Sequence, residues 1–412
     1  MKVAVAGYGV EGQASYRYWS QQAEVTIVDE RQEISSPDGA TTMLGEGAFS
    51  RLAEFDLIVR SPGVSPHKLP YQGKVSSATN EFFEQCREKN ISIIGVTGTK
   101  GKGTTCSLIV AMLKAADLNV HLVGNIGTPA LDELANIHTG DLVVYELSSF
   151  QLWDLRYSPH VAVVLPIEAD HLDVHADFND YLAAKSNIAK YQTEGDVMIY
   201  NSTNIWSRQI AASSPANNLI EYPFDLGELV QQLQLPGQHN RENAAAAVAA
   251  ARRFVTDERA IARGLASFHG LDHRLKLIGE HAGVDYYDDS ISTTPGSAIA
   301  AIKSFPQPKV IMLGGSDKGA DYSEIVELAA SSQTTVIAMG QTGRTIESLC
   351  QESGVECYYV EDMNSAVIMA SQIAKPGDVV LLSPASASFD QYRSYIDRGE
   401  QFIAAVRRMQ VQ

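Results

Sequence analysis

The sequence has few cysteines, no long apolar run and fewer basic than acidic residues. Its four cysteines (Cys86, Cys106, Cys350 and Cys357) form no CxxC pair and no metal-ligand spacing, as suits a reducing compartment. The longest purely apolar stretch is the alanine run 244–251, which is too short to cross a bilayer. Met1 to Gly7 reads directly as a strand, with no leader pattern before it. We therefore expect a cytoplasmic protein without a membrane partner.

Acidic residues outnumber basic ones, 49 to 32, and the formal net charge is −17. This charge is spread along the chain and argues against nucleic acid as the main partner. It does not argue against a small anionic substrate, because a few lysines and arginines can converge locally.

Apolar runs rich in β-formers alternate with helical patterns over almost all of the 412 residues. Such alternation predicts parallel sheets flanked by helices, an α/β fold. We place domain boundaries near 82 and 270, which gives three domains: 1–82, 83–270 and 271–412. The chain contains no internal repeat and no low-complexity tract.

The first predicted strand leads into Gly7, Gly9 and Gly12, and the next strand ends at Asp29 and Glu30. This spacing is close to the dinucleotide fingerprint. A single fingerprint leaves three readings open: NAD, another nucleotide, or plain tight-turn geometry. The turn "SPGV" at 61–64 follows a third strand and could either present N–H groups to a phosphate or be an ordinary turn.

The segment "GVTGTKGKGTT" at 95–105 lies between a predicted strand and a predicted helix, as a phosphate-binding loop does. Its glycines let the backbone wrap around oxyanions, and Lys102 can reach the β- and γ-phosphates. Gly103 occupies the place of the usual metal-binding hydroxyl, which Thr104 or Thr105 could supply instead. The alternative, a glycine-rich loop with surface lysines, does not explain the order of strand, loop and helix.

Glu146 and His171 follow two further predicted strands, and Lys185 lies on a predicted helix. A carboxylate at a strand end is a common Mg²⁺ ligand in α/β proteins. Each of these residues alone could be structural, and a surface lysine is the default for Lys185. No Ser-His-Asp constellation is apparent.

These motifs together resemble the Mur ligases over essentially the whole chain. The loop at 95–105, "GNIG" (124–127), "ELSSFQL" (146–152), "DHLDVH" with "AAKSNI", "GQHNRENAAAA" and "LDHRLKLIG" follow one another in the family's order. "DDSISTTP", "LGGSDKGAD" and "LSPASASFDQY" complete the series, and "ELSSFQL" with the last two is typical of the glutamate-adding branch.

The resemblance implies a function in peptidoglycan precursor synthesis. It implies an ATP-dependent ligase that joins D-glutamate to UDP-N-acetylmuramoyl-L-alanine (UDP-MurNAc-L-Ala) through an acyl phosphate. It further implies a Rossmann-like N-terminal domain that binds UDP rather than NAD, a central P-loop ATPase-like domain and a Rossmann-like C-terminal glutamate ligase domain. Two Mg²⁺ ions would take part, and we expect a monomer.

The resemblance also assigns roles to matching positions. Lys102, His171 and Lys185 would be catalytic, and Thr104, Glu146, His171 and a carbamylated (N6-carboxylated) Lys185 would hold the metals. ATP would contact Gly98, Thr99, Lys100, Gly101, Lys102, Gly103, Thr104, Thr105, Asn240, Asn243, Arg274 and Asp289. The UDP-sugar would contact Val10, Glu11, Asp29, Glu30, Ser61, Pro62, Gly63 and Asn125. Glutamate would contact Thr293, Lys318, Ser388 and Tyr395.

Three positions depart from the usual glutamate-ligase pattern: Gly103, Glu11 and Ile291. Glu11 would repel a diphosphate unless it turns away, and Ile291 replaces a common lysine near the glutamate site, which leaves D- against L-glutamate open. The version "GKGT" resembles folylpolyglutamate synthases, the alternative enzyme, although those proteins have no N-terminal UDP-binding unit. A catalytically silent nucleotide-binding module is the alternative from another class.

Overall fold

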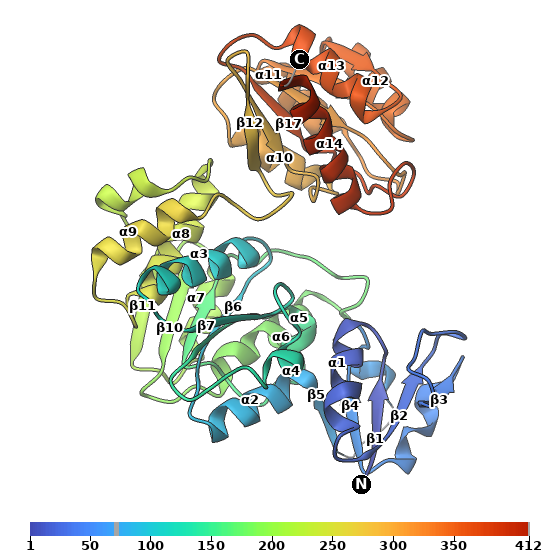
Figure 1. Ribbon diagram of the computed structural model, residues 1–412, viewed down its shortest axis with the longest axis vertical. Helices are drawn as coiled ribbons and strands as arrows, with labels where there is room; N and C mark the ends of the chain where they lie inside the picture. Colours follow the sequence, from blue (N-terminus) through green and yellow to red (C-terminus); the bar gives the residue numbers. More distant parts are fainter. Residues whose placement is uncertain (70–73, 411–412) are drawn as a thin grey trace. The chain divides into compact units, whose positions relative to one another are not determined.

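The computed structural model describes residues 1–69 and 74–410 (Figure 1). They form two compact units: residues 1–69 and 74–233 with 241–268, and residues 234–240 with 269–410. The first unit contains two sheets and the second contains one. Among the described residues no helix is both long and apolar enough to cross a membrane.

The first sheet has the strand order β3-β2-β1-β4-β5, and all of its strands are parallel. Val3 to Ala6 are fully buried, as expected for a parallel strand covered on both faces. Its elements are β1 (Lys2–Ala6), α1 (Val10–Trp19), β2 (Glu24–Asp29), β3 (Thr41–Leu44), the 3₁₀ helix η1 (Ala48–Glu54), β4 (Leu57–Arg60), the 3₁₀ helix η2 (Pro66–Lys68), β5 (Val75–Ser77) and α2 (Ala78–Glu88).

The second sheet has the order β11-β10-β9-β6-β8-β7 and is also entirely parallel. Its elements run from β6 (Ser92–Thr97), α3 (Lys102–Ala115), β7 (Val120–Gly124), α4 (Ala130–Glu133), β8 (Leu142–Glu146) and α5 (Ser149–Leu152) to β9 (Val161–Val164) and α6 (Phe178–Lys190). They continue with β10 (Val197–Asn201), α7 (Ile205–Ala212), β11 (Asn218–Tyr222), the 3₁₀ helix η3 (Gly227–Gln232), α8 (Gln238–Ala251) and α9 (Glu258–Ser267).

The alanine run 244–251 is a buried part of α8. Helices α3 and α9 pack closely. The contact requires Gly264, since a Cβ there would lie 2.4 Å from Met112 Cα. Small residues therefore let this layer of helices lie close together.

The sheet of the second unit has the order β12-β13-β17-β14-β15-β16, in which only the β12–β13 pair is antiparallel. Helices α10, α11 and α12 contribute to the core on one face, and α13 and α14 to the core on the other. Its elements are β12 (Lys276–His281), β13 (Val284–Asp288), α10 (Pro295–Lys303), β14 (Lys309–Leu313), α11 (Ser323–Ser331), β15 (Thr334–Ala338), α12 (Gly343–Glu352), β16 (Cys357–Tyr359), α13 (Met363–Ile373), β17 (Val379–Leu382) and α14 (Tyr395–Gln410).

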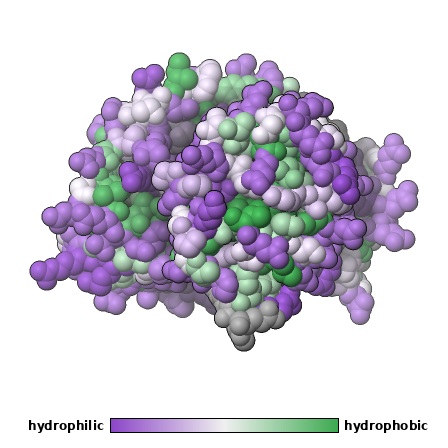
Figure 2. Space-filling view, turned by 90° about the horizontal axis from the view of Figure 1, so that it is seen from above, coloured by the Kyte–Doolittle hydropathy of each residue, from purple (hydrophilic) through white to green (hydrophobic). Residues whose placement is uncertain are grey.

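The predicted α/β fold with parallel sheets is confirmed, and the boundaries at 82 and 270 stay a prediction. On the face drawn in Figure 2, hydrophobic residues occur in small patches between hydrophilic ones. This surface agrees with the high charge of the sequence.

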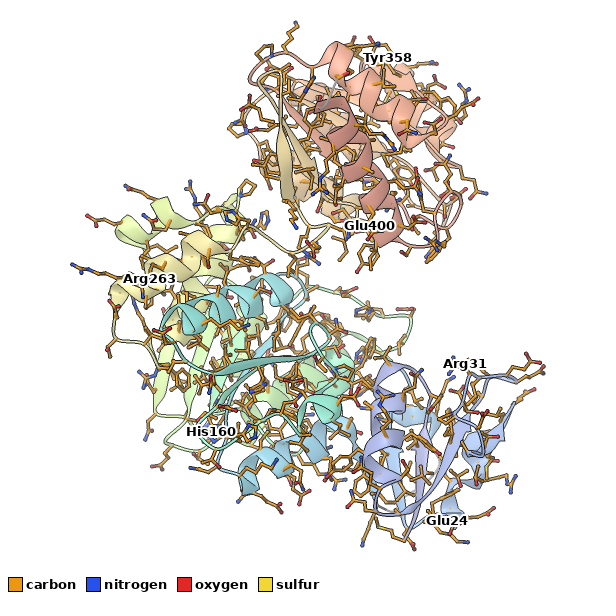
Figure 3. All side chains as sticks on the ribbon, viewed as in Figure 1. Glu24, Arg31, His160, Arg263, Tyr358 and Glu400 are labelled. Carbon is orange, nitrogen blue, oxygen red and sulfur yellow. The ribbon has the colours of Figure 1, made fainter. Side chains whose placement is uncertain are left out.

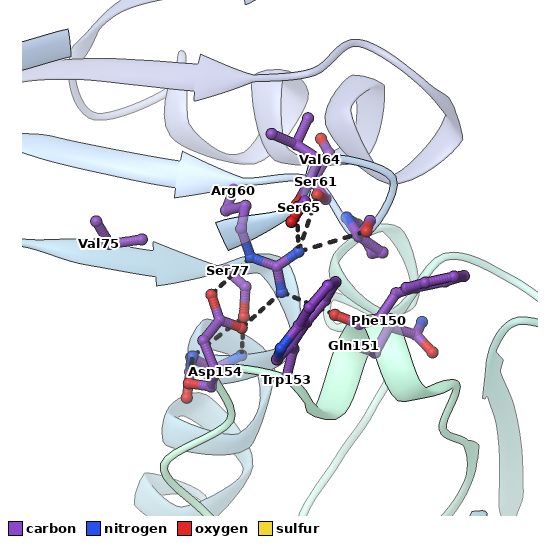
Figure 4. A network of polar contacts seen from close by, with 12 residues as sticks. Arg60, Ser61, Val64, Ser65, Val75, Ser77, Phe150, Gln151, Trp153 and Asp154 are labelled. Carbon is purple, nitrogen blue, oxygen red and sulfur yellow. Dashed lines mark hydrogen bonds and ion pairs between the residues drawn. The ribbon is translucent and has the colours of Figure 1, made fainter. Parts of the chain in front are cut away.

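A buried arginine joins the first sheet to the helix that follows β8. Arg60 ends β4, and its fully buried guanidinium makes two 2.7 Å bonds to the Asp154 carboxylate (Figure 4). It also donates to the carbonyl oxygens of Val64 at 2.8 Å and Phe150 at 2.7 Å. Breaking such a buried pair leaves unpaired polar groups, which makes its loss costly.

We predict that Arg60→Met lowers the free energy of unfolding of the first unit by about 3 kcal/mol. The matched control is Arg17→Met, which removes an exposed arginine–aspartate pair to Asp132 and should cost less than about 1 kcal/mol. All three tryptophans lie in the first unit, so urea titration followed by tryptophan fluorescence measures both variants. Equal losses in the two variants would contradict the prediction.

Candidate functional site

A cavity of ≈ 720 Å³ lies in the first unit, between the carboxyl ends of β1, β2 and β4 and the segments that follow β7 and β8. All eight residues predicted to contact the UDP-sugar line it: Val10, Glu11, Asp29, Glu30, Ser61, Pro62, Gly63 and Asn125. Pro62 and Asn125, which are 63 residues apart in the sequence, therefore line the same cavity.

The floor of the cavity is a tight glycine turn. Gly7 has φ +87°, and its carbonyl oxygen accepts a 2.6 Å bond from Ser61 Oγ. A Cβ at Gly12 would lie 2.1 Å from that oxygen, so only glycine fits there. Helix α1 starts after Gly9 without a side-chain cap, and its first N–H groups are suited to an anion.

Glu11 lies in the first turn of α1 but faces helix α5. Gln151 Nε2 donates a 2.6 Å bond to Glu11 Oε1, and burial raises the pKa of this carboxyl. The Gln151 amide is held in turn, since its Oε1 accepts from the N–H of Ser148 at 2.9 Å and from the Ser148 Oγ at 3.0 Å. We expected Glu11 to repel a diphosphate unless its side chain turns away. The side chain does turn away, toward Gln151.

Two cations at the cavity were not among the predicted residues. Arg31 donates to both Asp29 oxygens, at 2.9 and 2.7 Å, and Lys68 pairs with Glu30 at 2.9 Å. Burial alone would raise the pKa of Asp29, but bonds from Arg31 and from the Tyr8 N–H hold it below its usual value. Arg31 follows the Asp29–Glu30 pair directly, just after β2, and is labelled in Figure 3. A basic residue next to that acidic pair was the signal available in the sequence.

The predicted phosphate-binding loop connects β6 to α3, as expected. Gly101 has φ +84° and precedes α3, and a Cβ there would lie 2.4 Å from Asn243 Oδ1. Lys102 Nζ bonds back to the carbonyl oxygens of Gly98 at 3.0 Å and Thr99 at 2.9 Å. Thr104 and Thr105 are buried in the first turns of α3, whereas Lys100 is exposed and lies 3.6 Å from Glu168.

Lys185 is not a surface lysine, because only 1% of it is exposed. Its Nζ donates to Gly98 O at 2.9 Å and lies 4.7 Å from the centre of the Tyr181 ring. Burial, with a smaller contribution from Lys102, holds the pKa of Lys185 well below its usual value. A neutral amine in this position is nucleophilic.

Two of the buried side-chain oxygens in the segments around the loop and β8, those of Glu146 and Thr105, have no hydrogen-bond partner among the described residues. Glu146 ends β8 and is buried; Asn125 Nδ2 lies 3.3 Å from its Oε1, and its Oε2 has no hydrogen-bond partner among the described residues. Thr105 Oγ1 is likewise buried without such a partner. His171 is half-exposed, with φ +54°. Within residues 1–69 and 74–410, no group of three or more His, Cys, Asp or Glu side chains is placed to hold a metal.

A serine, a histidine and an aspartate do come together in the first unit, although none was apparent in the sequence. His175 Nε2 lies 3.0 Å from Ser149 Oγ, and His175 Nδ1 lies 3.1 Å from Asp180 Oδ2. His175 is separated from Ser149 by 26 residues, so the sequence gives no local signal for this chain of bonds.

In the second unit, Asp289 follows β13 and accepts bonds from the Leu275 N–H, Ser292 Oγ and Ser383 Oγ at 3.1, 2.6 and 2.7 Å. Burial raises the pKa of Asp289 to about 6 in spite of these bonds. Arg274 Nε is buried without a hydrogen-bond partner among the described residues. Asn240, also in this unit, is buried and donates to Pro236 O at 2.7 Å.

The four residues predicted to contact glutamate belong to segments that follow the carboxyl ends of three strands of this sheet. Thr293 follows β13, Lys318 follows β14, Ser388 follows β17 and Tyr395 begins α14. Ser388 is buried, and Lys318 Nζ lies 5.6 Å from the centre of the exposed Phe389 ring. The carboxyl ends of parallel strands are where α/β proteins bind ligands.

Two family models match this chain. The Mur ligase middle domain matches residues 96–228, and the Mur ligase glutamate ligase domain matches residues 273–386. The UDP-N-acetylmuramoylalanine–D-glutamate ligase of Symbiobacterium thermophilum is 34% identical over 99% of this chain and 98% of its own length. The chain belongs to the Mur ligase family.

A second curated relative agrees with this assignment, and two solved structures share the fold. The enzyme of the same name from Acetivibrio thermocellus is 33% identical over 97% of this chain and 95% of its own length. The structure of UDP-N-acetylmuramate-alanine ligase from Thermotoga maritima shares the fold, with a TM-score of 0.61 at 16% identity over 99% of this chain and 100% of the other. Folylpolyglutamate synthase from Mycobacterium tuberculosis, solved with ADP, has a TM-score of 0.58 at 13% identity over 80% of this chain and 93% of the other.

We predict that Asp289→Asn gains stability relative to the unaltered Mur ligase as the pH rises from 4 to 6. The unfolded carboxyl ionises near pH 3.8, whereas the folded one keeps its proton to about pH 6. Ionisation thus favours the unfolded state of the unaltered chain by about 3 kcal/mol above pH 6, and the variant has no such penalty. Scanning calorimetry at several pH values measures the difference, and a difference that does not change with pH would contradict the prediction.

Proposed function

We propose that this Mur ligase joins D-glutamate to UDP-MurNAc-L-Ala at the expense of ATP and releases ADP and phosphate. The observation that carries the proposal is the cavity of the first unit. It is lined by all eight residues that we expect to contact the UDP-sugar. Asn125 belongs to this cavity and lies against Glu146, so the cavity borders the segment that ends β8. The two relatives named UDP-N-acetylmuramoylalanine–D-glutamate ligase, 34% and 33% identical over nearly the full chain, further support the proposed reaction.

In the proposed reaction the carboxylate of the UDP-sugar attacks the γ-phosphate of ATP and forms an acyl phosphate. The amine of glutamate then displaces phosphate through a tetrahedral intermediate, so no protein nucleophile is needed. Two anions must approach each other, and Lys102 would stabilise the charge on the phosphates. Its bonds to Gly98 O and Thr99 O hold its Nζ over the loop that would wrap the phosphates.

Thr104, Glu146, His171 and Lys185 would hold two Mg²⁺ ions, which screen phosphate charge and polarise the transferred group when bound. Glu146 is suited to this role because its Oε2 has no other partner among the described residues. Carbamylation would convert Lys185 from a base into a carboxylate ligand, and the lowered pKa of its amine favours reaction with CO₂.

The division of labour among three domains is part of the proposal. Residues 1–82 would bind the UDP-sugar, residues 83–270 ATP, and residues 271–412 glutamate, through Thr293, Lys318, Ser388 and Tyr395. Asn240, Asn243, Arg274 and Asp289 would hold the adenine, ribose and phosphates. The enzyme would act as a cytoplasmic monomer.

The alternative enzyme is a folylpolyglutamate synthase-like ligase, whose fold the chain shares over 80% of its length. We predict that phosphate release requires UDP-MurNAc-L-Ala together with D-glutamate, and that mass spectrometry finds the glutamyl product. D- and L-glutamate are offered separately, because Ile291 leaves the isomer open. Lys102→Ala is the control and should abolish ligation while the UDP-sugar still binds.

Release only with dihydropteroate or a folate and glutamate would favour the alternative enzyme. No release with any acceptor would favour a silent nucleotide-binding module. Both outcomes would refute the proposed reaction.

We predict that Lys185→Ala loses ligase activity and regains part of it with added short carboxylic acids, which replace the carbamate as an anionic ligand. The matched control is Lys190→Ala on the same helix, whose exposed side chain lies 5.4 Å from the Tyr191 ring centre. The measurement is ligation rate with and without formate or acetate. Full activity of Lys185→Ala without an additive would refute the carbamate.

A further inference from the structure

The segment between β9 and α6 carries His171 on an irregular turn. The N–H groups of Val174 and His175 both donate to His171 O, at 3.1 and 3.0 Å. His171 itself has φ +54°, a conformation that costs free energy for a residue with a Cβ. Such a turn keeps its shape only where its surroundings hold it.

His175 closes this turn, and its side chain is fully buried. Its ring centre lies 4.0 Å from that of Trp153, and it stacks on Phe150 with 8° between the ring planes. Tyr181 meets it edge-on at 5.3 Å. The imidazole is therefore enclosed by three aromatic rings: Phe150 of α5, Trp153 directly after α5, and Tyr181 of α6.

Both imidazole nitrogens have partners on the neighbouring helices. A carboxylate can only accept, so His175 Nδ1 donates its proton to Asp180 over 3.1 Å. Burial lowers the pKa of His175, and in the neutral ring Nε2 accepts from Ser149 Oγ over 3.0 Å. Ser149 is only 2% exposed, so it is enclosed rather than presented to a substrate as a nucleophile.

The partners of His175 are themselves fixed. Asp180 accepts from Trp153 Nε1 at 3.0 Å and from the Ala176 N–H at 3.1 Å. His67 Nε2 lies 3.6 Å from the same carboxylate. Ser149 begins α5 three residues after Glu146, and Asp180 lies in the first turn of α6, the helix of Lys185.

We propose that His175 is a positioning residue that fixes the His171 turn between α5 and α6. This inference rests on the proposed function for its effect on catalysis. By binding Ser149 on one side and Asp180 on the other, His175 sets the place of His171 relative to the segments of Glu146 and Lys185. It touches neither substrate nor metal in this role.

His175→Phe tests this proposal, because phenylalanine keeps the ring among its aromatic neighbours and removes both hydrogen bonds. We expect amide hydrogen exchange in residues 168–177 of the ligand-free protein to rise about tenfold, since the bonds that hold the turn are lost. We expect kcat to fall by about tenfold or more and KM for ATP to change by less than about twofold, because only the metal-side geometry moves. The Mg²⁺ concentration at half-maximal rate should rise.

The matched control is His121→Phe, since His121 also bridges two groups, Glu133 at 2.7 Å and Asp141 at 3.2 Å, away from this turn. It should leave exchange in 168–177 and kcat unchanged. Ser149→Ala should add little to His175→Phe, although it slows the unaltered enzyme, because both act through one bond. His175→Asn, which can still donate to Asp180, should recover part of kcat.

Unchanged exchange in 168–177, or additive effects of the two substitutions, would overturn the proposal. Increased exchange throughout the first unit, with kcat and KM for ATP affected alike, would overturn it too, since that pattern indicates general destabilisation. Should His175→Phe not fold, Ser149→Ala and His175→Asn carry the same tests. If the unaltered protein joins no substrates, the proposed function fails while the exchange experiment still decides the role of His175.

Discussion

The Arg60 guanidinium has five N–H donors and is fully buried, so the surrounding chain must supply hydrogen-bond acceptors for it. It takes them from two places: the turn at 61–64 and the end of α5, through Phe150 O and Asp154. Residues of both segments line the cavity that we propose for the UDP-sugar. The geometry of that cavity therefore depends on an interaction that no ligand makes.

Two lysines share one acceptor beside this framework. Lys102 Nζ and Lys185 Nζ both donate to Gly98 O, at 3.0 and 2.9 Å. Burial lowers the pKa of Lys185, and repulsion by the nearby Lys102 lowers it further. A carbamate on Lys185 would replace this repulsion by attraction, so the proposed modification also relieves an electrostatic conflict within the loop.

The strands predicted before Gly7, Asp29, the turn at 61–64, the loop at 95–105, Glu146 and His171 are all interior strands of the first two sheets. Interior strands such as β1 and β8 are buried on both faces and read as continuous apolar runs. Edge strands such as β3 and β11 are partly exposed and carry polar residues among the apolar ones, so their residues resemble loops. The eight residues at the cavity were predicted from the resemblance to the Mur ligases, and all of them line it. The roles of Arg60 and His175 were not, because Arg60 and Asp154 are 94 residues apart and His175 and Ser149 are 26 residues apart.

The departure at Glu11 is compensated by a residue of the motif that otherwise identifies the family. Gln151, in "ELSSFQL", keeps its amide oxygen for Ser148, which leaves its Nε2 to bind the Glu11 carboxylate. The same side chain thus caps α5 and draws a carboxylate away from the uncapped start of α1. A negative charge at a helix N-terminus competes with an anionic ligand for the same N–H groups. Because Gln151 and burial hold Glu11 aside, the first turn of α1 keeps its N–H groups available to a diphosphate although the sequence places an acid beside them.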